Sequence, residues 1–209
     1  MRSTPGEPNG PAGPDGPSAP ARQPRLVVGL GNPGEEYRET RHNLGFRVVE
    51  TLARRRDVSL GELECNSILG RADDRMVLVM PQTYMNRSGH ALRCLAEKHG
   101  YEPERMLVVY DEVNLPLGKL RLRPGGSPAG HRGLESVVES LRTARIPRLR
   151  LGCAGEDGPP PGDELVSYGL SPCAADEAEA VTDMIERAAD ACESWAAEGI
   201  EAAMNRFNG

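Results

Sequence analysis

Leu26-Val-Val-Gly-Leu-Gly-Asn-Pro-Gly-Glu-Glu-Tyr37 encodes a strand that ends in a sharp turn. The run at its start is apolar and partly β-branched, which predicts a buried strand over residues 25–30. Glycines and Pro33 follow, so the backbone must change direction where this strand ends. The turn places Asn32 on a loop, and loops held by a rigid scaffold commonly carry chemistry.

The spacing of Gly29, Gly31 and Gly34 also fits the fingerprint of a dinucleotide-binding site. Such a site needs a helix that opens at the second glycine and an acidic residue about 20 residues further on. Pro33 and the glutamates after it fit poorly beside a pyrophosphate. The acid at the right distance is Glu50, which lies inside a helical pattern. A lone glycine fingerprint is weak evidence, so dinucleotide binding is ranked low.

Charge is distributed unevenly along the 209 residues, whose net charge is −6. Residues 119–150 hold eight Lys or Arg against two acids, a net charge of +6, whereas residues 151–209 hold two against thirteen, a net charge of −11. This asymmetry predicts one basic face for an anionic partner, with the acidic part turned away. The competing interpretation is a solvated surface of mixed charge.

The cysteines and the hydropathy indicate a cytoplasmic protein that does not enter a membrane. Five cysteines are scattered without a C-x-x-C pair, which favours reduced thiols over disulfides or zinc ligands. No apolar run approaches the roughly 20 residues of a membrane helix, and no apolar signal-peptide core follows the N-terminus.

The first 22 residues contain six prolines and four glycines, with almost no large apolar side chain. Such a segment cannot bury enough surface to offset chain entropy, so residues 1–22 are predicted to be a disordered tail. Glu7, Asp15 and the scarcity of arginine disfavour an organelle transit peptide. Residues 23–209 form the predicted domain.

Strands and helices are predicted to alternate along this domain. The predicted strands are residues 25–30, 66–70, 75–80, 106–110, 119–123 and 148–153, with a short edge strand over 165–169. The predicted helices are 43–56, 83–99, 132–141 and a long C-terminal helix. Gly100 is expected to end the second helix in a left-handed conformation, Ser171 and Pro172 to begin the last one, and Trp195 to anchor it in the core. This pattern predicts an α/β fold: a single domain with a twisted, mixed β-sheet flanked by helices.

Polar residues gather at predicted strand ends, where open α/β sheets bind their ligands. They comprise Asn32 with His42 and Asn43, then residues 81–86, 111–116 and 125–133. A histidine can take a proton from water, a carboxylate can fix its tautomer, and amides can hold a carbonyl. No serine or cysteine lies in a G-x-S-x-G elbow, so direct attack by water is favoured. The four histidines form no i,i+4 pair, and no metal is expected.

The order of these motifs resembles bacterial-type peptidyl-tRNA hydrolase over roughly residues 25–207. The motifs are Val-Gly-Leu-Gly-Asn-Pro-Gly-x-x-Tyr (28–37), Thr-Arg-His-Asn (40–43), Pro-Gln-Thr-Tyr-Met-Asn-x-Ser-Gly (81–89) and Asp-Glu-Val-Asn-Leu-Pro (111–116). The resemblance implies an esterase that cleaves the bond between a stranded peptide and the 3′ ribose of tRNA. It also implies a monomer that needs no metal or cofactor.

The same resemblance implies a role for each matching residue. His42 corresponds to the general base, Asp111 to the carboxylate that orients it, and Asn32 and Asn86 to amides that position peptide, water and oxyanion. The residues expected to bind peptide or tRNA are Tyr37, Asn43, Tyr84, Asn86, His131, Arg132, Arg123 and Arg150. Among these, Arg123 and Arg150 correspond to a pair that clamps the tRNA 5′-phosphate. Two interpretations stay open for His131: contact with the tRNA 3′ end, or organisation of the glycine-rich loop.

The sequence departs from the family at two places. Arg132 stands where the family usually has Asn, and residues 156–162 are acidic and proline-rich where relatives often carry lysines. We expect Arg132 to grip RNA near the 3′ end; the alternatives are contact with the oxyanion or a lowered pKa of His42. The rival function is a catalytically silent RNA-binding protein of the same fold, and the presence of the catalytic residues favours the enzyme.

Overall fold

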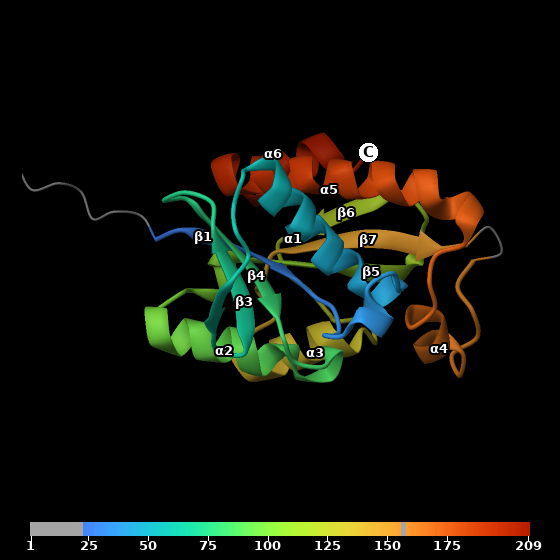
Figure 1. The fold of residues 1–209 in the computed structure, drawn as a ribbon, viewed down its shortest axis with the longest axis horizontal. Coiled ribbons are helices and arrows are strands. Elements are labelled where there is room, and N and C mark those ends of the chain that lie inside the picture. The colour runs from blue at the N-terminus through green and yellow to red at the C-terminus, as the bar shows by residue number, and fades with distance from the viewer. Residues whose placement is uncertain (1–22, 156–157) are drawn as a thin grey trace, which may run out of the picture.

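The computed structural model describes residues 23–155 and 158–209. The predicted tail, residues 1–22, lies outside the described residues, as do two positions of the 156–162 loop. A seven-stranded sheet runs through the described part of the chain, with helices on both of its faces (Figure 1). The predicted α/β architecture is confirmed.

The sheet is mixed, as predicted. Its strands are β1 (Arg25–Gly29), β2 (Glu62–Glu64), β3 (Ser67–Arg71), β4 (Met76–Pro81), β5 (Met106–Pro116), β6 (Leu120–Arg123) and β7 (Arg148–Ala154). They are ordered β2-β3-β4-β1-β5-β7-β6. The neighbours from β4 to β7 are parallel, whereas β2, β3 and β6 join in antiparallel pairs. The parallel strands therefore end at one common edge.

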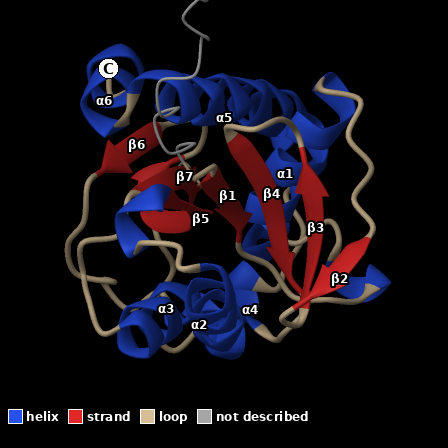
Figure 2. Ribbon diagram, turned by 90° about the vertical axis from the view of Figure 1, so that its left-hand side faces the viewer, coloured by secondary structure: helices blue, strands red, loops and turns tan. Residues whose placement is uncertain are grey.

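Two layers of helices cover the sheet (Figure 2). The layer formed by α1 (Leu44–Arg55), α5 (Ala178–Glu198) and α6 (Ile200–Phe207) lies on one face, and that of α2 (Ser88–His99) and α3 (Arg132–Leu141) lies on the other. Successive residues of β1 supply both cores, because strand side chains alternate. Val27 joins the core with α1 and α5, and Val28 joins the core with α2 and α3. Trp195 is 2% exposed in the first core, which confirms it as an anchor of α5.

The glycines of the first turn serve helix–strand contact. A Cβ atom on Gly29 would lie 2.2 Å from the carbonyl oxygen of Gly45, so α1 can cross β1 this closely only because both positions lack a side chain. Two short turns, η1 (Glu35–Tyr37) and η2 (Arg41–Asn43), separate this strand from α1. Since no helix opens at the second glycine, the dinucleotide-binding interpretation is wrong.

Two predicted boundaries differ from the structure, and a third agrees with it. Strand β5 continues to Pro116 because it pairs with β7 through a bulge beyond Glu112, whereas the sequence predicted a loop after residue 110. The predicted helix over 83–99 begins as the turn η3 (Met85–Arg87) before α2. Gly100 ends α2 with φ 71°, as predicted.

The segment before the C-terminal helix also differs. Residues 165–169 form the short helix α4 (Leu165–Gly169), so the predicted edge strand is wrong. Helix α5 begins only at Ala178, after the turn η5 (Ala175–Glu177), so Ser171 and Pro172 do not begin it. Tertiary contacts explain the difference, because the N–H of Arg41 donates to the carbonyl of Ser171 and keeps this stretch extended.

A disulfide joins Cys65, in the turn between β2 and β3, to Cys94 on α2. The prediction that all five cysteines are reduced is therefore wrong for this pair, while Cys153, Cys173 and Cys192 are free. The two sulfurs meet because α2 packs over the edge of the sheet, and their sequence separation of 29 gives no sign of this contact.

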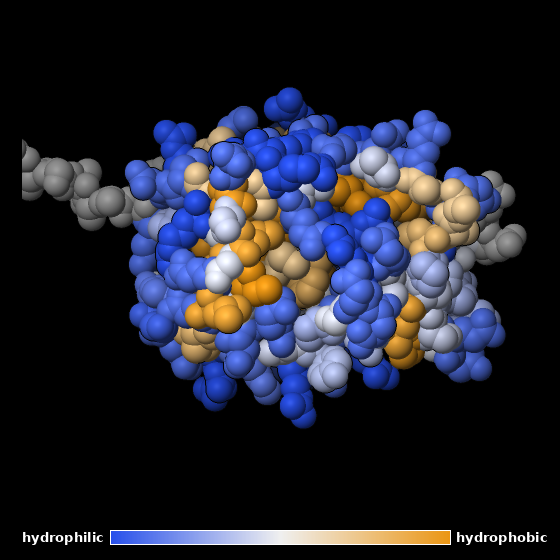
Figure 3. Space-filling model, viewed as in Figure 1, coloured by the Kyte–Doolittle hydropathy of each residue, from blue (hydrophilic) through white to orange (hydrophobic). Residues whose placement is uncertain are grey.

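Most of the face drawn in Figure 3 is hydrophilic, with apolar residues in separate groups. Among the described residues, the large apolar side chains that are exposed are Leu63, Tyr84, Val166 and Leu170. Within residues 23–155 and 158–209, no helix is both long enough and apolar enough to span a bilayer.

Candidate active site

The turn η2 fixes three successive side chains by contacts with three different parts of the chain. Asn43 accepts a hydrogen bond from the N–H of Asn32 (2.9 Å) and donates to its carbonyl (3.0 Å). His42 contacts Asp111 on β5, and Arg41 contacts the segment after α4. Asn43, which was expected to bind substrate, is buried and holds the loop after β1 in place.

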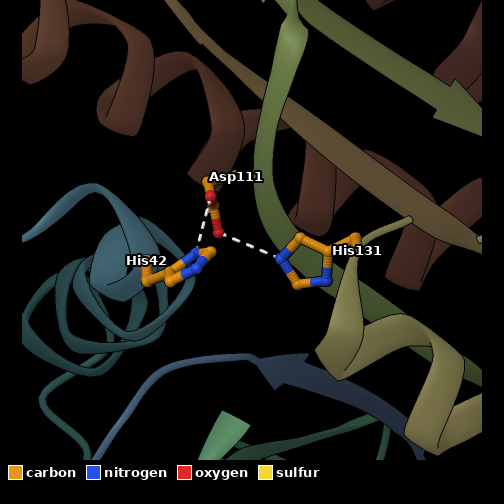
Figure 4. A group of neighbouring side chains, drawn as sticks. All are labelled: His42, Asp111 and His131. Carbon is orange, nitrogen blue, oxygen red and sulfur yellow. Dashed lines mark hydrogen bonds and ion pairs between the residues drawn. The ribbon is translucent and has the colours of Figure 1, made fainter. Parts of the chain in front are cut away.

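His42, Asp111 and His131 form a chain of hydrogen bonds centred on the carboxylate (Figure 4). Nδ1 of His42 lies 2.8 Å from one carboxylate oxygen, and Nε2 of His131 lies 3.1 Å from the other. Asp111 is 1% exposed and lies just beyond the point where β1 ends beside β5, since Gly29 pairs with Val109. The fold thus places this carboxylate at the edge where the loop after β1 turns back.

The tautomer of each histidine follows from its partners. The N–H of Leu134 donates to Nδ1 of His131 (3.2 Å), which caps the start of α3. Nε2 of His131 therefore carries the proton and donates it to Asp111. His42 donates from Nδ1 to the same carboxylate, so in the neutral ring Nε2 is the unprotonated nitrogen. His42 can accept a proton there, whereas both ring nitrogens of His131 are occupied.

Charge and burial act in opposite directions on this group. Burial alone would lower the pKa of His42, but the Asp111 carboxylate raises it above the ordinary value by charge and by hydrogen bonding. The cationic Arg132 acts in the lowering direction. Burial alone would raise the pKa of Asp111, yet the two histidines hold it well below its ordinary value. Asp111 thus remains a carboxylate and keeps His42 basic.

A cavity of about 200 Å³ opens beside these residues. Asp111 to Asn114 form one wall, Ala129 to Arg132 a second, and Leu165 and Val166 of α4 a third. Helix α4 also approaches the free nitrogen of His42, because a Cβ on Gly169 would lie 2.4 Å from Nε2. Glycine leaves space at this point that any other residue would fill.

The predicted amides lie at the same edge of the sheet. Asn32 is buried, and its side-chain oxygen accepts from the N–H of Met85 (2.8 Å), which ties η3 to the loop after β1. Asn86, the next residue, is exposed. Tyr84 is 60% exposed and Tyr37 is half-buried. The structure therefore brings Asn32 and the Asn86 turn together and leaves Tyr84 open to solvent.

The basic residues of β6 and β7 share one face of the sheet. Arg121 pairs with Arg150 and Arg123 with Arg148 across the strands, so all four point to the same side. Arg148 is buried and donates to the carbonyls of Gly126 and Ala144, which is a structural role.

The two predicted phosphate contacts differ in their surroundings. Arg123 is exposed at the end of β6. Arg150 donates from Nε and Nη2 to the buried Glu112, at 2.9 and 2.6 Å. Glu112 follows Asp111 directly on β5, so this ion pair connects the basic face to the strand that carries Asp111. Arg132 is exposed at the mouth of the cavity, at the first position of α3.

Metal-ligating atoms converge at one point among the described residues. One such atom each from His42, Asp111 and His131 lies within 4.8 Å of the others. Their separations of 2.8 and 3.1 Å are those of hydrogen bonds, so an ion would have to displace both protons that the carboxylate now accepts.

Sequence reasoning missed Arg41, Glu112 and Gly169, although all three contact predicted site residues or their partners. Arg41 and Glu112 lie inside two of the quoted motifs, next to His42 and Asp111, but were given no role of their own. Gly169 lies in a segment predicted as a strand, and only its tertiary contact with His42 gives it importance.

Comparison with known proteins agrees with this geometry. The family model described as peptidyl-tRNA hydrolase matches residues 26–209. The chain is 46% identical to a peptidyl-tRNA hydrolase of Methylacidiphilum infernorum, over 88% of this chain and 97% of that one. It is 45% identical to one of Chloroflexus aurantiacus, over 88% and 98%. The crystal structure of peptidyl-tRNA hydrolase from Acinetobacter baumannii superimposes with a TM-score of 0.83 at 32% identity, covering 92% of this chain and 97% of that one. The chain therefore belongs to the peptidyl-tRNA hydrolase family.

Proposed function

We propose that the protein hydrolyses the ester between a peptide, or an N-blocked aminoacyl group, and the 3′ ribose of tRNA, releasing both. The observation that carries this proposal is the Asp111-bound His42, whose unprotonated Nε2 lies beside a cavity. Family membership and the assembled catalytic group argue against the catalytically silent RNA-binding protein.

The reaction needs one proton acceptor and one set of amide donors. Nε2 of His42 takes a proton from water, and the resulting hydroxide attacks the ester carbonyl. The carbonyl oxygen becomes an oxyanion, which amide N–H groups of Asn32 and Asn86 stabilise. The tetrahedral intermediate then expels the 3′ oxygen of the ribose, which takes the proton back from His42. Asp111 stabilises the imidazolium throughout, and the step requires no metal or cofactor.

His131 acts in this scheme by fixing Asp111. Both of its ring nitrogens are engaged, by the carboxylate and by the N–H of Leu134, and its side chain is 9% exposed. This geometry favours organisation of the site over contact of the ring with RNA. Tyr84, which is 60% exposed, and the half-buried Tyr37 are assigned to substrate contact.

The basic face binds the RNA. Arg123 and Arg150 are assigned to the tRNA 5′-phosphate, and Glu112 holds the Arg150 guanidinium in a fixed orientation. Arg132, at the mouth of the cavity, is assigned to a phosphate or ribose near the 3′ end. We further assign the protein to the cytoplasm, where this substrate arises, as a monomer.

Release of the acyl group from N-acetyl-aminoacyl-tRNA tests this function, with free aminoacyl-tRNA as the comparison substrate. The blocked substrate should be cleaved and the free one spared. The matched variant is His42→Ala, which should lower kcat by roughly 10²–10⁴-fold while the thermal melt stays two-state. Binding of tRNA without turnover by the unmodified protein would support the silent RNA-binding alternative.

A further inference from the structure

Arg41 is a buried cation that directly precedes His42. Its side chain is 7% exposed, and its Nη2 lies 2.6 Å from the carboxylate of Glu177. Its Nη1 donates to the hydroxyl of Ser171 (3.0 Å) and to the carbonyl of Pro172. A planar guanidinium can serve these acceptors at the same time because its N–H groups form a fixed fork.

Further contacts bind the same two segments together. The Arg41 guanidinium lies over the Tyr168 ring, 4.3 Å from its centroid. The backbone N–H of Arg41 donates to the carbonyl of Ser171 (3.0 Å), and Thr40 pairs with Pro172. The turn that carries His42 is thus attached to residues 168–177 by the Arg41 side chain and by the backbone of Thr40 and Arg41.

This attached segment includes the wall of the cavity. Gly169 lies against Nε2 of His42. In the sequence it stands between Tyr168 and Ser171, both of which contact the Arg41 side chain. The Tyr168 hydroxyl donates to the carbonyl of Cys153 (2.6 Å), which attaches α4 to the end of β7 as well. The space beside the reacting nitrogen is therefore set by where Arg41 holds this segment.

We propose that Arg41 is a positioning residue, which fixes residues 168–171 beside Nε2 of His42 and so sets the space in which water and the ester can reach that nitrogen. The inference rests on the hydrolase function proposed above. The His42–Asp111 hydrogen bond does not involve Arg41, so we expect loss of Arg41 to keep that bond and to displace the wall.

A measurable consequence follows for the titration of His42. The groups that face it are Asp111 on β5 and Arg132 and His131 at the start of α3, with the uncharged Gly169 on the α4 side. Burial lowers the pKa of His42, and Gly169 supplies part of that burial. Displacement of the wall would admit water to the ring, so the pKa of His42 would rise.

Two variants test the proposal without changing the net charge of the ion pair. Arg41→Lys keeps the charge and loses the fork, and the double variant Arg41→Gln/Glu177→Gln removes both charges. Glu179→Gln, at an exposed position of α5, is the matched control. The measurements are kcat and KM with N-acetyl-aminoacyl-tRNA across pH, the pKa of His42 by NMR, and the thermal melt.

Both variants should lose about 10–100-fold in kcat/KM, since a displacement of about 1 Å at a catalytic site costs this much. The acidic limb of the kcat/KM profile and the NMR pKa of His42 should move together to higher pH. A loss of activity that matches the unfolded fraction, with the limb unmoved, would make Arg41 merely structural and overturn the proposal. Wild-type kinetics would overturn it as well.

Two other outcomes are possible: the Arg41 variants do not fold, or the unmodified protein has no hydrolase activity. If neither variant folds, Ser171→Ala removes a single acceptor of Arg41 and should cost about fivefold in kcat/KM, the worth of one hydrogen bond; an unchanged value contradicts the proposal. If the unmodified protein and Glu179→Gln both lack activity, the proposed function fails. The NMR pKa of His42 in the Arg41 variants then still decides the positioning role.

Discussion

Asp111→Asn should inactivate the enzyme by placing the proton of His42 on the wrong nitrogen. The carboxylate offers an acceptor to each histidine, whereas the amide offers one acceptor and one NH2 group. Nδ1 of His131 is held as an acceptor by the N–H of Leu134, so its Nε2 must remain a donor. The new amide must turn its oxygen to His131 and its NH2 group to His42. His42 then carries its proton on Nε2, the nitrogen that has to accept one from water.

The size of the effect has two parts. Turning the amide the other way would leave the N–H of Leu134 without its partner, at a cost of about 1–3 kcal/mol for a buried donor. Loss of the charge-assisted hydrogen bond to the imidazolium costs about 1.5–3 kcal/mol more. Together these give about 2.5–6 kcal/mol, or a fall in kcat of about 10² to 10⁴-fold at roughly 1.36 kcal/mol per factor of ten.

Single-turnover hydrolysis of N-acetyl-aminoacyl-tRNA measures this fall, with circular dichroism to verify folding. The double variant Asp111→Asn/His131→Gln is the sharper test. A glutamine can accept from the NH2 group of the new amide, which frees the amide oxygen for His42, so the double variant should be about fivefold or more faster than Asp111→Asn alone. The reasoning fails if Asp111→Asn stays within tenfold of wild type, or if the second substitution slows it further.

Other substitutions test the remaining assignments. Arg132→Asn should raise KM and keep kcat within a few-fold. It should also move the acidic limb of the kcat/KM profile to higher pH, because the lost cation lowers the pKa of His42 in the wild type. A collapse of kcat at constant KM would instead make Arg132 a transition-state contact. Arg123→Ala and Arg150→Ala should each reduce the slope of the logarithm of the tRNA binding constant against the logarithm of salt concentration by about 0.7–0.9. Equal losses of affinity for tRNA with and without its 5′-phosphate would refute the clamp. Cys65→Ser should lower the free energy of unfolding by about 3–4 kcal/mol, since the disulfide closes a loop of 29 residues. The value of kcat should not change. If neither the substitution nor a reductant shifts the denaturant midpoint of unfolding, no disulfide forms.

The sequence determined most of the fold, because its local signals agree with the tertiary contacts. Residues 25–30 and 106–110 are apolar runs long enough to be buried strands, and the helix over 132–141 begins and ends in the structure as predicted. Prediction failed where a tertiary partner decides. Pro116 belongs to a strand because β7 lies beside it, and residues 165–169 form a helix held by Arg41 and Cys153.

The candidate site divides in the same way. Residue type and the family resemblance predicted His42, Asp111, Asn32 and Asn86, since a base, a carboxylate and amides suit ester hydrolysis by water. The structure joins His42 to Asp111 by a hydrogen bond. Sequence left the role of His131 open, and it assigned Asn43 to substrate. In the structure, the Asn43 amide is hydrogen-bonded to the backbone of Asn32, and both ring nitrogens of His131 are hydrogen-bonded to other residues of the protein.

Arg41 shows why the remainder depends on tertiary structure. Its importance lies in Ser171 and Glu177, about 130 residues further along the chain. The same holds for Glu112 with Arg150 and for Cys65 with Cys94. Residue type limits what each side chain is able to do, but hydrogen bonds and ion pairs act over about 3 Å. Which groups come that close is decided by the packing of the helices on the sheet.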